Sequence, residues 1–473
     1  MQEEAHSTDV STVPIRLRTS LPGCSIPYVP YMVPVSWRRA QLSTLVNKVL
    51  ATAAGEHRPV PFDFIADGEL LRSTLDEYIT QKGLSPETTI ELEYIRSTLP
   101  PTLLDSAAHE DWVSAADARQ SGKVLTASFD GNVRIYNVNA LSESPRTLEP
   151  VSSGARPSLT SAKWLSDDAV VTGAMDGLVS CWHVPPGESG SVPVIRSHDL
   201  RFHTAPVSSV DVGALQGDTI PVVSAAWNGT VAVWDVPPHV EAAPESSVKR
   251  RRTKGSSAEA REDAQPASST EPRVVLHHVA PAIGVQAATA LGTSVMPGAN
   301  SKTVAVLSGE RVWSAAWEGT VKAWDLAAGG IMVGQRSSDK VHLCIDALLP
   351  SASAEVVAGN MDHSVALFDL RDQVSTAMSI ANAHSAPVGA VRANPAVPQL
   401  FASGSYDGRI KVWDVRSPKQ ALFALTQPSA STGDAPAKRT KVLALDWSSD
   451  GKSIVAGGED CRISVYQGAS AGA

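Results

Sequence analysis

The chain lacks most features that mark metal, redox and phosphate chemistry. Its 473 residues include only four cysteines, and none stands in a Cys-x-x-Cys pair. The pattern therefore predicts neither a zinc site nor a thioredoxin-like centre. The phosphate-loop motif Gly-x-x-x-x-Gly-Lys-[Ser/Thr] and the zinc motif His-Glu-x-x-His are also missing. We expect no catalytic site and no cofactor, so a partner must supply the energy for any remodelling.

Hydropathy and charge argue against a membrane or secreted protein and against a general nucleic-acid coat. No run of about 18 apolar residues is present, and the acidic start of the chain lacks an apolar signal core. We therefore expect no transmembrane helix and a reducing, intracellular setting. The net charge is −9, from 40 basic and 49 acidic residues, which argues against a general nucleic-acid coat. A local basic patch stays compatible with this balance.

A sevenfold repeat fills most of the chain. In each unit a polar turn residue stands six positions before an aromatic residue. The pairs are Asp130/Tyr136, Asp176/Trp182, Asn228/Trp234, Glu318/Trp324, Asp362/Phe368, Asp407/Trp413 and Asp460/Tyr466. Three pairs end in Trp-Asp, and the segments between them alternate as strands do. These features predict a seven-bladed WD40 β-propeller over residues 108–467, an all-β fold that is chiefly a platform for other macromolecules.

The spacing of the repeats locates one insertion. Successive turn residues are 44 to 53 residues apart, except for one gap of 90. A blade takes about 40–45 residues, so the long gap holds one blade and an insertion, which we place at residues 237–273. This segment is rich in Ala, Ser, Pro and Glu and is expected to be disordered. It carries a basic run that is typical of a nuclear localisation signal or an rRNA phosphate contact, although basic runs are often only solvated loop. The run comprises Lys249, Arg250, Arg251, Arg252 and Lys254.

The chain ends soon after the last repeat, so the last blade lacks an outer strand of its own. We expect the linker at residues 96–107 to supply that closing strand and remove an open sheet edge. Before the linker, residues 10–95 have a different pattern. We expect strands at 13–19, 26–33, 62–65 and 88–95, a helix at 40–54 and a short helical turn at 75–79. This order is typical of an α+β ubiquitin-like (β-grasp) domain.

The combination of these two domains resembles a known family. The segments Val60–Ile65, Gly68–Arg72, Gly83–Glu87 and Asp111–Ser114 strengthen the likeness. Together they resemble the NLE-domain WD-repeat family of ribosome biogenesis factors, and within it the WD-repeat members of the PeBoW complex. The Notchless-type proteins share the domain order but have eight blades, and the insertion at 237–273 has no counterpart that we can match.

The resemblance implies a specific function. Such proteins are non-catalytic assembly factors of the large (60S) ribosomal subunit, needed for pre-rRNA processing at the 27S stage and for 25S/28S and 5.8S maturation. Their propeller binds the block-of-proliferation protein, and pescadillo joins through the complex. Their ubiquitin-like domain offers a carboxylate to the metal-ion-dependent adhesion site of the AAA ATPase midasin, which releases the factor from the pre-60S particle. The implied location is the nucleus, in nucleolus and nucleoplasm.

Glu87 is the candidate for that metal contact. Ser85-Pro86-Glu87 lies in the turn before the last strand of the N-terminal domain. There a carboxylate can protrude as a hard ligand for Mg²⁺, and its place in Gly-Leu-Ser-Pro-Glu matches the family's metal-contacting glutamate. The plain alternative is a solvated surface carboxylate. Other candidates in the same domain are Asp67, Glu69 and Asp76.

Residues just before the repeat turns form a second candidate site. Six of the seven are large and apolar or aromatic, which suits interface anchors, with partial burial between blades as the alternative. They are Phe129, Met175, Trp227, Trp317, Met361 and Tyr406. The turn residues themselves are expected to be structural, with His203 and His384 as hydrogen-bond partners. A ubiquitin-ligase or proteasome adaptor is the alternative function, and an apolar patch on the N-terminal sheet would favour it.

Overall fold

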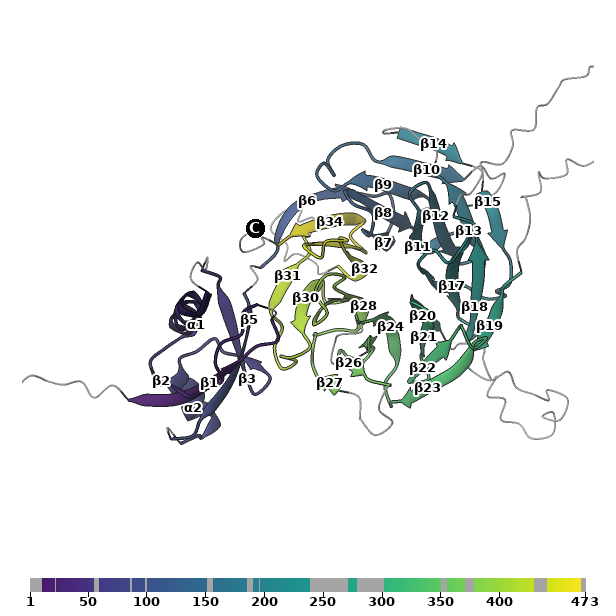
Figure 1. Cartoon of the computed structure of the whole chain (residues 1–473). Coiled ribbons are helices and arrows are strands. Elements are labelled where there is room, and N and C mark those ends of the chain that lie inside the picture. The colour runs from purple at the N-terminus through teal and green to yellow at the C-terminus, as the bar shows by residue number, and fades with distance from the viewer. Residues whose placement is uncertain are drawn as a thin grey trace, which may run out of the picture. The chain divides into compact units, whose positions relative to one another are not determined.

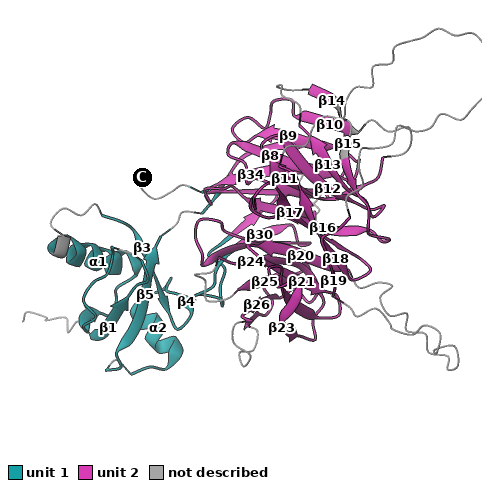
Figure 2. Ribbon diagram, turned by 45° about the vertical axis from the view of Figure 1, so that its right-hand side comes forward, with its two compact units in different colours: residues 1–101, 412–423, 468–473 teal, residues 102–411, 424–467 magenta. Residues whose placement is uncertain are grey.

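A computed structural model gives the fold, and it describes most of the chain (Figure 1). The described residues are 11–21, 23–54, 59–85, 87–97, 100–150, 156–184, 190–194, 196–238, 271–278, 302–349, 355–370, 378–428 and 440–468. Two compact units are distinguished in Figure 2. One comprises residues 1–101, 412–423 and 468–473, and the other comprises residues 102–411 and 424–467.

The N-terminal part contains one mixed sheet and both described helices. Its elements are β1 (Thr12–Arg18), β2 (Tyr31–Pro34), α1 (Arg39–Ala54), β3 (Phe62–Ala66), β4 (Glu69–Leu70), α2 (Leu75–Lys82) and β5 (Ile90–Arg96). The sheet order is β2-β1-β5-β3-β4. The central pair, β1 and β5, is parallel, and β1 pairs antiparallel with β2. This is the expected α+β ubiquitin-like arrangement.

Apolar alternation explains the core of this part. Leu42 and Val46 of α1 are fully buried, as are Ile15 of β1 and Leu92 of β5, so one face of the sheet packs on the helix. Each fully buried aliphatic side chain contributes about 1.5–3 kcal/mol of transfer free energy. Two details differ from the sequence expectation. β2 begins at Tyr31 rather than at residue 26, because the prolines before it have no N–H for a ladder, and the two-residue strand β4 was not foreseen.

Helix α2 has well-defined ends. Thr74 caps its N-terminus in a capping box: its hydroxyl accepts from Glu77 N–H, and the Glu77 side chain accepts from Thr74 N–H. Gly83 ends the helix in the left-handed region, with φ 62°. These caps fix the position of the following turn, which carries Glu87.

Seven further sheets form the propeller, and their strands follow the chain in order except for β14, which joins the first sheet, and β6, which joins the last. The first sheet comprises β7 (Val113–Asp117), β8 (Lys123–Ser128), β9 (Val133–Asn137), β10 (Arg146–Pro150) and β14 (Gly190–Val194). The second comprises β11 (Leu159–Ser166), β12 (Ala169–Ala174), β13 (Val179–His183) and β15 (Arg196–Leu200). The third comprises β16 (Val207–Val212), β17 (Ile220–Ala226), β18 (Thr230–Val236) and β19 (Val274–His277). The fourth comprises β20 (Thr303–Ser308), β21 (Arg311–Ala316), β22 (Thr320–Asp325) and β23 (Ile331–Ser337). The fifth comprises β24 (His342–Ala347), β25 (Val356–Asn360), β26 (Val365–Phe368) and β27 (Met378–Ile380). The sixth comprises β28 (Val388–Ala393), β29 (Leu400–Ser405), β30 (Arg409–Asp414) and β31 (Phe423–Thr426). The last comprises β32 (Val442–Trp447), β33 (Ser453–Gly458), β34 (Arg462–Gln467) and β6 (Thr102–Ala108).

The first strands of the seven sheets surround the centre of the propeller, and each packs against the first strand of the next sheet (Figure 1). The last sheet takes its outer strand from the other end of the chain, because β6 pairs antiparallel with β34 from Thr102 to Ala108. A strand borrowed in this way ties the two ends of the ring by backbone hydrogen bonds and leaves no open edge there. The propeller sheets thus include residues from Thr102 on, ahead of the boundary at 108 that the repeats suggested.

The long gap between repeats contains the strand β19 between two stretches that lie outside the described residues. Residues 239–270 and 279–301 lie outside the described part, and between them β19 completes the third sheet. The expected insertion at 237–273, with its basic run, therefore falls almost wholly outside the described residues. The second segment, 279–301, was not foreseen; it separates His278 from the first strand of the fourth sheet.

Candidate protein-interaction sites

The turn between α2 and β5 presents Glu87 to solvent. Glu87 N–H donates to Ser85 Oγ at 3.3 Å, and Thr88 N–H donates to Ser85 O at 2.9 Å, so the turn is internally hydrogen-bonded. Leu84 packs against the domain core and anchors the turn. Glu87 is exposed, and no described Lys, Arg or His nitrogen lies within 4.0 Å of its carboxylate. Its oxygens are therefore available to an external ligand.

Two of the other three candidate carboxylates are engaged. Lys82 Nζ lies 3.5 Å from Asp67 Oδ2 and 3.5 Å from Glu69 Oε2. Asp76 is exposed in the first turn of α2, where its charge favours the helix dipole. Glu87 therefore combines an exposed position, a fixed turn and a free carboxylate better than Asp67 or Glu69 does.

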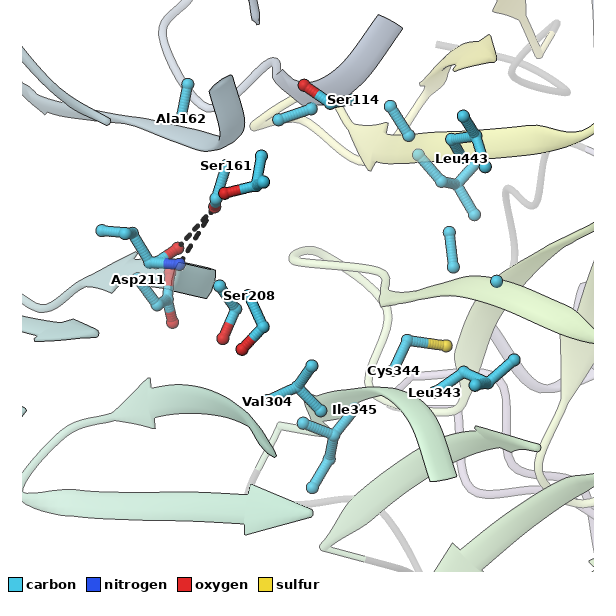
Figure 3. A pocket seen from close by; sticks show the side chains of 18 of the residues that line it. Ser114, Ser161, Ala162, Ser208, Asp211, Val304, Leu343, Cys344, Ile345 and Leu443 are labelled. Atoms are coloured by element: carbon cyan, nitrogen blue, oxygen red, sulfur yellow. Dashed lines mark hydrogen bonds between the residues drawn. The ribbon is translucent and has the colours of Figure 1, made fainter. Parts of the chain in front are cut away.

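A cavity of about 350 Å³ occupies the channel at the centre of the propeller (Figure 3). Its wall consists mainly of short side chains from the first strands of the sheets, including Ser114, Ser161, Ser208, Val304 and Cys344. Four of the six expected anchors, Phe129, Met175, Trp227 and Tyr406, also line this cavity. The structure thus brings residues from four different repeats to one channel.

The backbone explains how the anchors come together. At six of the seven turns, the residue before the turn donates its N–H to a carbonyl group in the segment just before a first strand. Phe129 bonds to Trp112 O at 3.1 Å, Trp227 to Pro206 O at 3.0 Å and Tyr406 to Pro387 O at 3.0 Å. We call this end of the channel the mouth; it includes the six anchors and the segments before the first strands. Trp317 and Met361 do not line the cavity and are 37% and 43% exposed.

The sequence analysis missed three further residues at the mouth. Trp112 is 38% exposed, and its ring meets that of Phe129 edge-on at 6.1 Å. Lys441 Nζ lies 5.6 Å from the Trp112 ring and 5.8 Å from the Tyr406 ring, within cation–π range. Lys302 Nζ lies 5.8 Å from the Trp227 ring. The mouth therefore alternates aromatic faces and ammonium groups, a surface suited to a macromolecular partner.

The turn residues have the structural role expected of them. His384 Nδ1 lies 3.3 Å from Asp407 Oδ2, and its Nε2 lies 2.7 Å from Ser403 Oγ. His203 differs in detail. It contacts Ser224 and Thr230 at 2.7 and 3.0 Å, and reaches the turn residue Asn228 only through the Thr230 hydroxyl. Burial lowers the pKa of His203 to about 4, so the ring is neutral and serves as a hydrogen-bonding spacer.

A ring of charged groups lies at the other end of the first strands. Asp117, Asp211, Asp346 and Asp446 each accept a backbone N–H from the next sheet, at 2.9, 2.9, 2.7 and 3.0 Å respectively. Cations complete the ring: Lys163 Nζ and Arg392 Nε each lie 3.6 Å from an oxygen of Asp446. Although burial alone would raise it, Arg119 and Lys163 hold the pKa of the Asp117 carboxyl below its ordinary value. The cations are thus ion-paired with the aspartates, and the aspartates join neighbouring sheets, which is a structural role.

Among the residues that the structure describes, no group of three or more His, Cys, Asp or Glu side chains could hold a metal ion. Neither described helix has the length and apolar composition needed to cross a bilayer. The basic run from Lys249 to Lys254 lies outside the described part of the chain.

Comparisons with known proteins agree with both parts of the fold. Residues 13–79 match the NLE (NUC135) domain. Residues 102–137, 195–235, 376–414 and 432–467 match the WD domain, G-beta repeat. The crystal structure of the WD40 β-propeller domain of Doa1 is similar, with a TM-score of 0.52 and 15% identity, covering 78% of this chain and 97% of that one. This last likeness concerns the fold alone.

Several curated relatives match along nearly their whole length. Ribosome biogenesis protein YTM1 of Laccaria bicolor is 31% identical over 439 residues, 89% of this chain and 88% of the relative. Ribosome biogenesis protein ytm1 of Schizosaccharomyces pombe is 29% identical and 99% covered on both sides. Ribosome biogenesis protein WDR12 homolog of Oryza sativa is 30% identical and 96% covered on both sides. With its NLE domain and WD-repeat propeller, the chain belongs to the YTM1/WDR12 family of ribosome biogenesis proteins.

Proposed function

We propose that this chain is a non-catalytic assembly factor of the large ribosomal subunit that acts in the PeBoW complex. The propeller binds the block-of-proliferation protein, and pescadillo joins through that complex. The factor serves pre-rRNA processing at the 27S stage and works in the nucleolus and nucleoplasm. Family membership supports the ribosomal role, and the division of labour between two domains follows the resemblance described above.

The observation that carries the release step is the free carboxylate of Glu87. We propose that it completes the coordination of the metal in midasin's adhesion site, after which ATP-driven remodelling removes the factor from the pre-60S particle. Mg²⁺ prefers hard oxygen ligands in octahedral geometry. Glu87 offers such oxygens from a capped and hydrogen-bonded turn, with no described cation competing for them.

The surface of the N-terminal sheet favours this function over a ubiquitin-pathway adaptor. A ubiquitin-like receptor contact would need an apolar patch on the sheet. The outer face of the central pair instead carries Arg16 and Arg18 of β1 and Glu91 and Glu93 of β5, and Arg18 lies 3.9 Å from Glu93. The exposed apolar side chains of this part lie beside these charges: the Tyr28 ring is 5.4 Å from the Arg16 guanidinium and its hydroxyl donates to Glu91 at 2.6 Å, and Met32 is in register with Pro14. Charged groups therefore interrupt the apolar surface.

A pull-down with midasin's adhesion-site domain tests the metal contact. Wild-type chain should bind with Mg²⁺ and be released by EDTA, whereas Glu87→Ala should not bind and should keep the wild-type melting curve. Glu87→Asp should bind weakly at best, because its carboxylate reaches one methylene less far. Asp76→Ala is the matched control, since it removes another exposed carboxylate of the same domain. Binding that survives EDTA, or that Asp67→Ala alone abolishes, would refute the assignment.

Substitutions in the two domains should have different effects in cells. Glu87→Ala protein should still bind the block-of-proliferation protein and enter pre-60S particles, but should accumulate there and block large-subunit maturation. Trp227→Ala should instead weaken partner binding, since an aromatic anchor contributes about 2 kcal/mol or more. If Trp227→Ala protein melts early as well, the residue is a core residue and not an anchor.

The basic run at Lys249–Lys254 is proposed as the import signal, with an rRNA contact as the alternative. Deletion of residues 239–270, which keeps Arg273 and its hydrogen bond to Val233 O, should leave the Tm of the propeller within a few degrees of wild type and the protein cytoplasmic. A deletion protein that still reaches the nucleus would exclude the import role.

A further inference from the structure

Two hydrogen-bond donors at the mouth have no acceptor among the described residues. Lys302 stands just before β20, and Trp227 stands in the turn between β17 and β18. Among the described residues, no carboxylate oxygen lies within 4.0 Å of Lys302 Nζ, whose one recorded contact is with the Trp227 ring. Trp227 Nε1 is buried and has no hydrogen-bond partner. Both residues line the same cavity.

An unpaired donor in such a place is costly to the free protein. Burial lowers the pKa of the Lys302 ammonium below its ordinary value, which reflects an unfavourable environment for the charge. Lys441 gives a direct comparison within the same mouth, because its Nζ lies 3.6 Å from Glu459 Oε2. One mouth cation is therefore compensated by the chain itself, and the other is left without a carboxylate.

The cavity limits what can enter. Its volume of about 350 Å³ is near the lower end for ligand pockets. An α-helix with side chains is about 10–12 Å across, so the cavity is suited to a few side chains of an extended segment. Short residues such as Ser114 and Ser208 line the wall and leave this space open (Figure 3).

We propose that the mouth binds an Asp or Glu side chain from an extended acidic segment of a protein partner, with Lys302 Nζ and Trp227 Nε1 as donors to its carboxylate. The aromatic rings of Tyr406 and Trp112 border the same opening and cover the apolar flanks of the segment. This inference rests on the proposed function, since it specifies the chemistry that the propeller's partner presents at the anchors. A nucleic-acid phosphate is less suited, because backbone recognition uses several cations, and among the described residues of the mouth only the Lys302 ammonium lacks a carboxylate.

Zero-length carbodiimide crosslinking tests the contact directly, because it joins a carboxylate only to an amine that touches it. Tagged full-length chain is crosslinked alone and in complexes purified from cells, and the products are mapped by mass spectrometry. In the complex, Lys302 should be joined to an Asp or Glu of another protein. Lys441 should be joined to Glu459 in both samples, which controls for reactivity at the mouth.

Several outcomes would overturn the proposal. If Lys441 is joined to Glu459 while Lys302 stays unlinked in the complex, no carboxylate sits on Lys302. If Lys302 is joined only to its own chain, an internal segment is the occupant. Complexes that nuclease treatment dissociates, with Lys302 unlinked, would indicate a nucleic-acid ligand instead.

Affinity gives a second, independent measurement. Lys302→Gln should weaken binding of the crosslinked partner about tenfold or more, as expected for the loss of one charge-assisted hydrogen bond. Its Tm should be equal to or higher than that of wild type, because an uncompensated charge is removed.

Lys452→Gln is the control; Lys452 is an exposed lysine in the turn between β32 and β33. If Trp227→Ala weakens binding and Lys302→Gln does not, the interface stands and the carboxylate inference is wrong. If neither variant weakens binding, the anchor assignment is wrong as well.

Discussion

Acidification should destabilise the propeller through its buried histidines, and His278 gives the clearest case. His278 is fully buried, with Nδ1 2.6 Å from Ser314 Oγ and Nε2 2.7 Å from Thr320 Oγ1. The Trp324 indole also donates to Ser314 Oγ at 2.8 Å, so the ring holds three strands together. Burial, with a smaller effect of Lys322, lowers the pKa of His278 from 6.5 to about 3. The folded protein therefore keeps this ring neutral.

The direction of the pH effect follows from proton linkage. Above pH 6.5 both folded and unfolded chains carry a neutral ring, and the contribution of His278 to stability is complete. As pH falls from 6.5 toward 3, the unfolded chain gains a proton that the folded chain does not, so stability decreases by about 1.36 kcal/mol per pH unit. At pH 5 the loss is about 2 kcal/mol. His109 and His203, whose pKa values are lowered to about 4, bring the total to about 6 kcal/mol. That is comparable to the whole stability of a typical domain, about 5–15 kcal/mol.

A glutamine substitution isolates the contribution of one histidine. Gln427 occupies the equivalent backbone position in the sixth sheet: its N–H donates to Gly408 O at 3.1 Å, as His278 N–H donates to Gly229 O at 2.9 Å. Its amide donates to Asp460 Oδ1 at 3.1 Å, so the position accepts glutamine. His278→Gln should therefore fold, lose about 1 kcal/mol at pH 7.5, and show a shallower decline below pH 6.5.

Urea unfolding at pH 7.5, 6.5, 5.5 and 5.0 measures this slope. Between pH 6 and 5, His278→Gln should decline by about 1.2 kcal/mol less than wild type. The neighbouring His277 is exposed, so His277→Gln is a matched control that should keep the wild-type slope. If His278→Gln and wild type lose stability in parallel, His278 is protonated in the folded state and the argument fails.

Three further changes test the packing of each part. Gly389→Ala should destabilise the propeller by about 1–3 kcal/mol in a thermal melt and weaken partner binding, because its Cβ would lie 2.5 Å from Tyr406 Cε1; unchanged binding would mean that the ring is not an anchor. Leu92→Ala should cost about 2–5 kcal/mol in the N-terminal transition and leave the propeller transition in place, which calorimetry can resolve. Asp446→Ala should lower the unfolding free energy by on the order of 3 kcal/mol, because it removes the acceptor of Ala118 N–H and the negative charge that pairs with Lys163 and Arg392. A loss under about 1 kcal/mol would show that the charged ring does not stabilise the contacts between sheets.

The repeat register carried most of the fold prediction. The sequence spacing of six positions between the turn residue and the aromatic residue, as between Asp407 and Trp413, occurs seven times. This spacing requires a turn and a strand of constant length, a local geometry that does not depend on the rest of the fold. The N-terminal domain was predicted less sharply. The buried positions of α1 follow helical spacing, as Leu42 and Val46 illustrate, but β4 is only two residues long and leaves no periodic pattern.

The mouth was predicted only where the repeat reaches it. Trp227 and Tyr406 precede turns of the sevenfold register, so their convergence could be inferred from spacing. Trp112, Lys302 and Lys441 lie in the segments before first strands, whose lengths vary, and no spacing relates one to another. Lys302 also follows residues 279–301, which the repeat pattern did not separate from the blade. Only three-dimensional proximity shows that it faces Trp227.

Charged side chains at the two ends of the first strands differ in whether they have partners within the chain. We infer that the paired end contributes to stability and that the other end contributes to binding. At the far end of β20, Leu307 N–H donates to Asp211 on the neighbouring sheet, within a ring where each aspartate has a backbone donor. Five residues earlier in the same strand region, Lys302 has no carboxylate partner among the described residues. Buried polar groups are nearly always paired in a folded protein. Four aspartates around the channel are paired by the chain's own backbone and cations, whereas at the opposite end the Lys302 ammonium has no carboxylate among the described residues. The first arrangement joins neighbouring sheets, and the second leaves a charge at the mouth for a partner to pair.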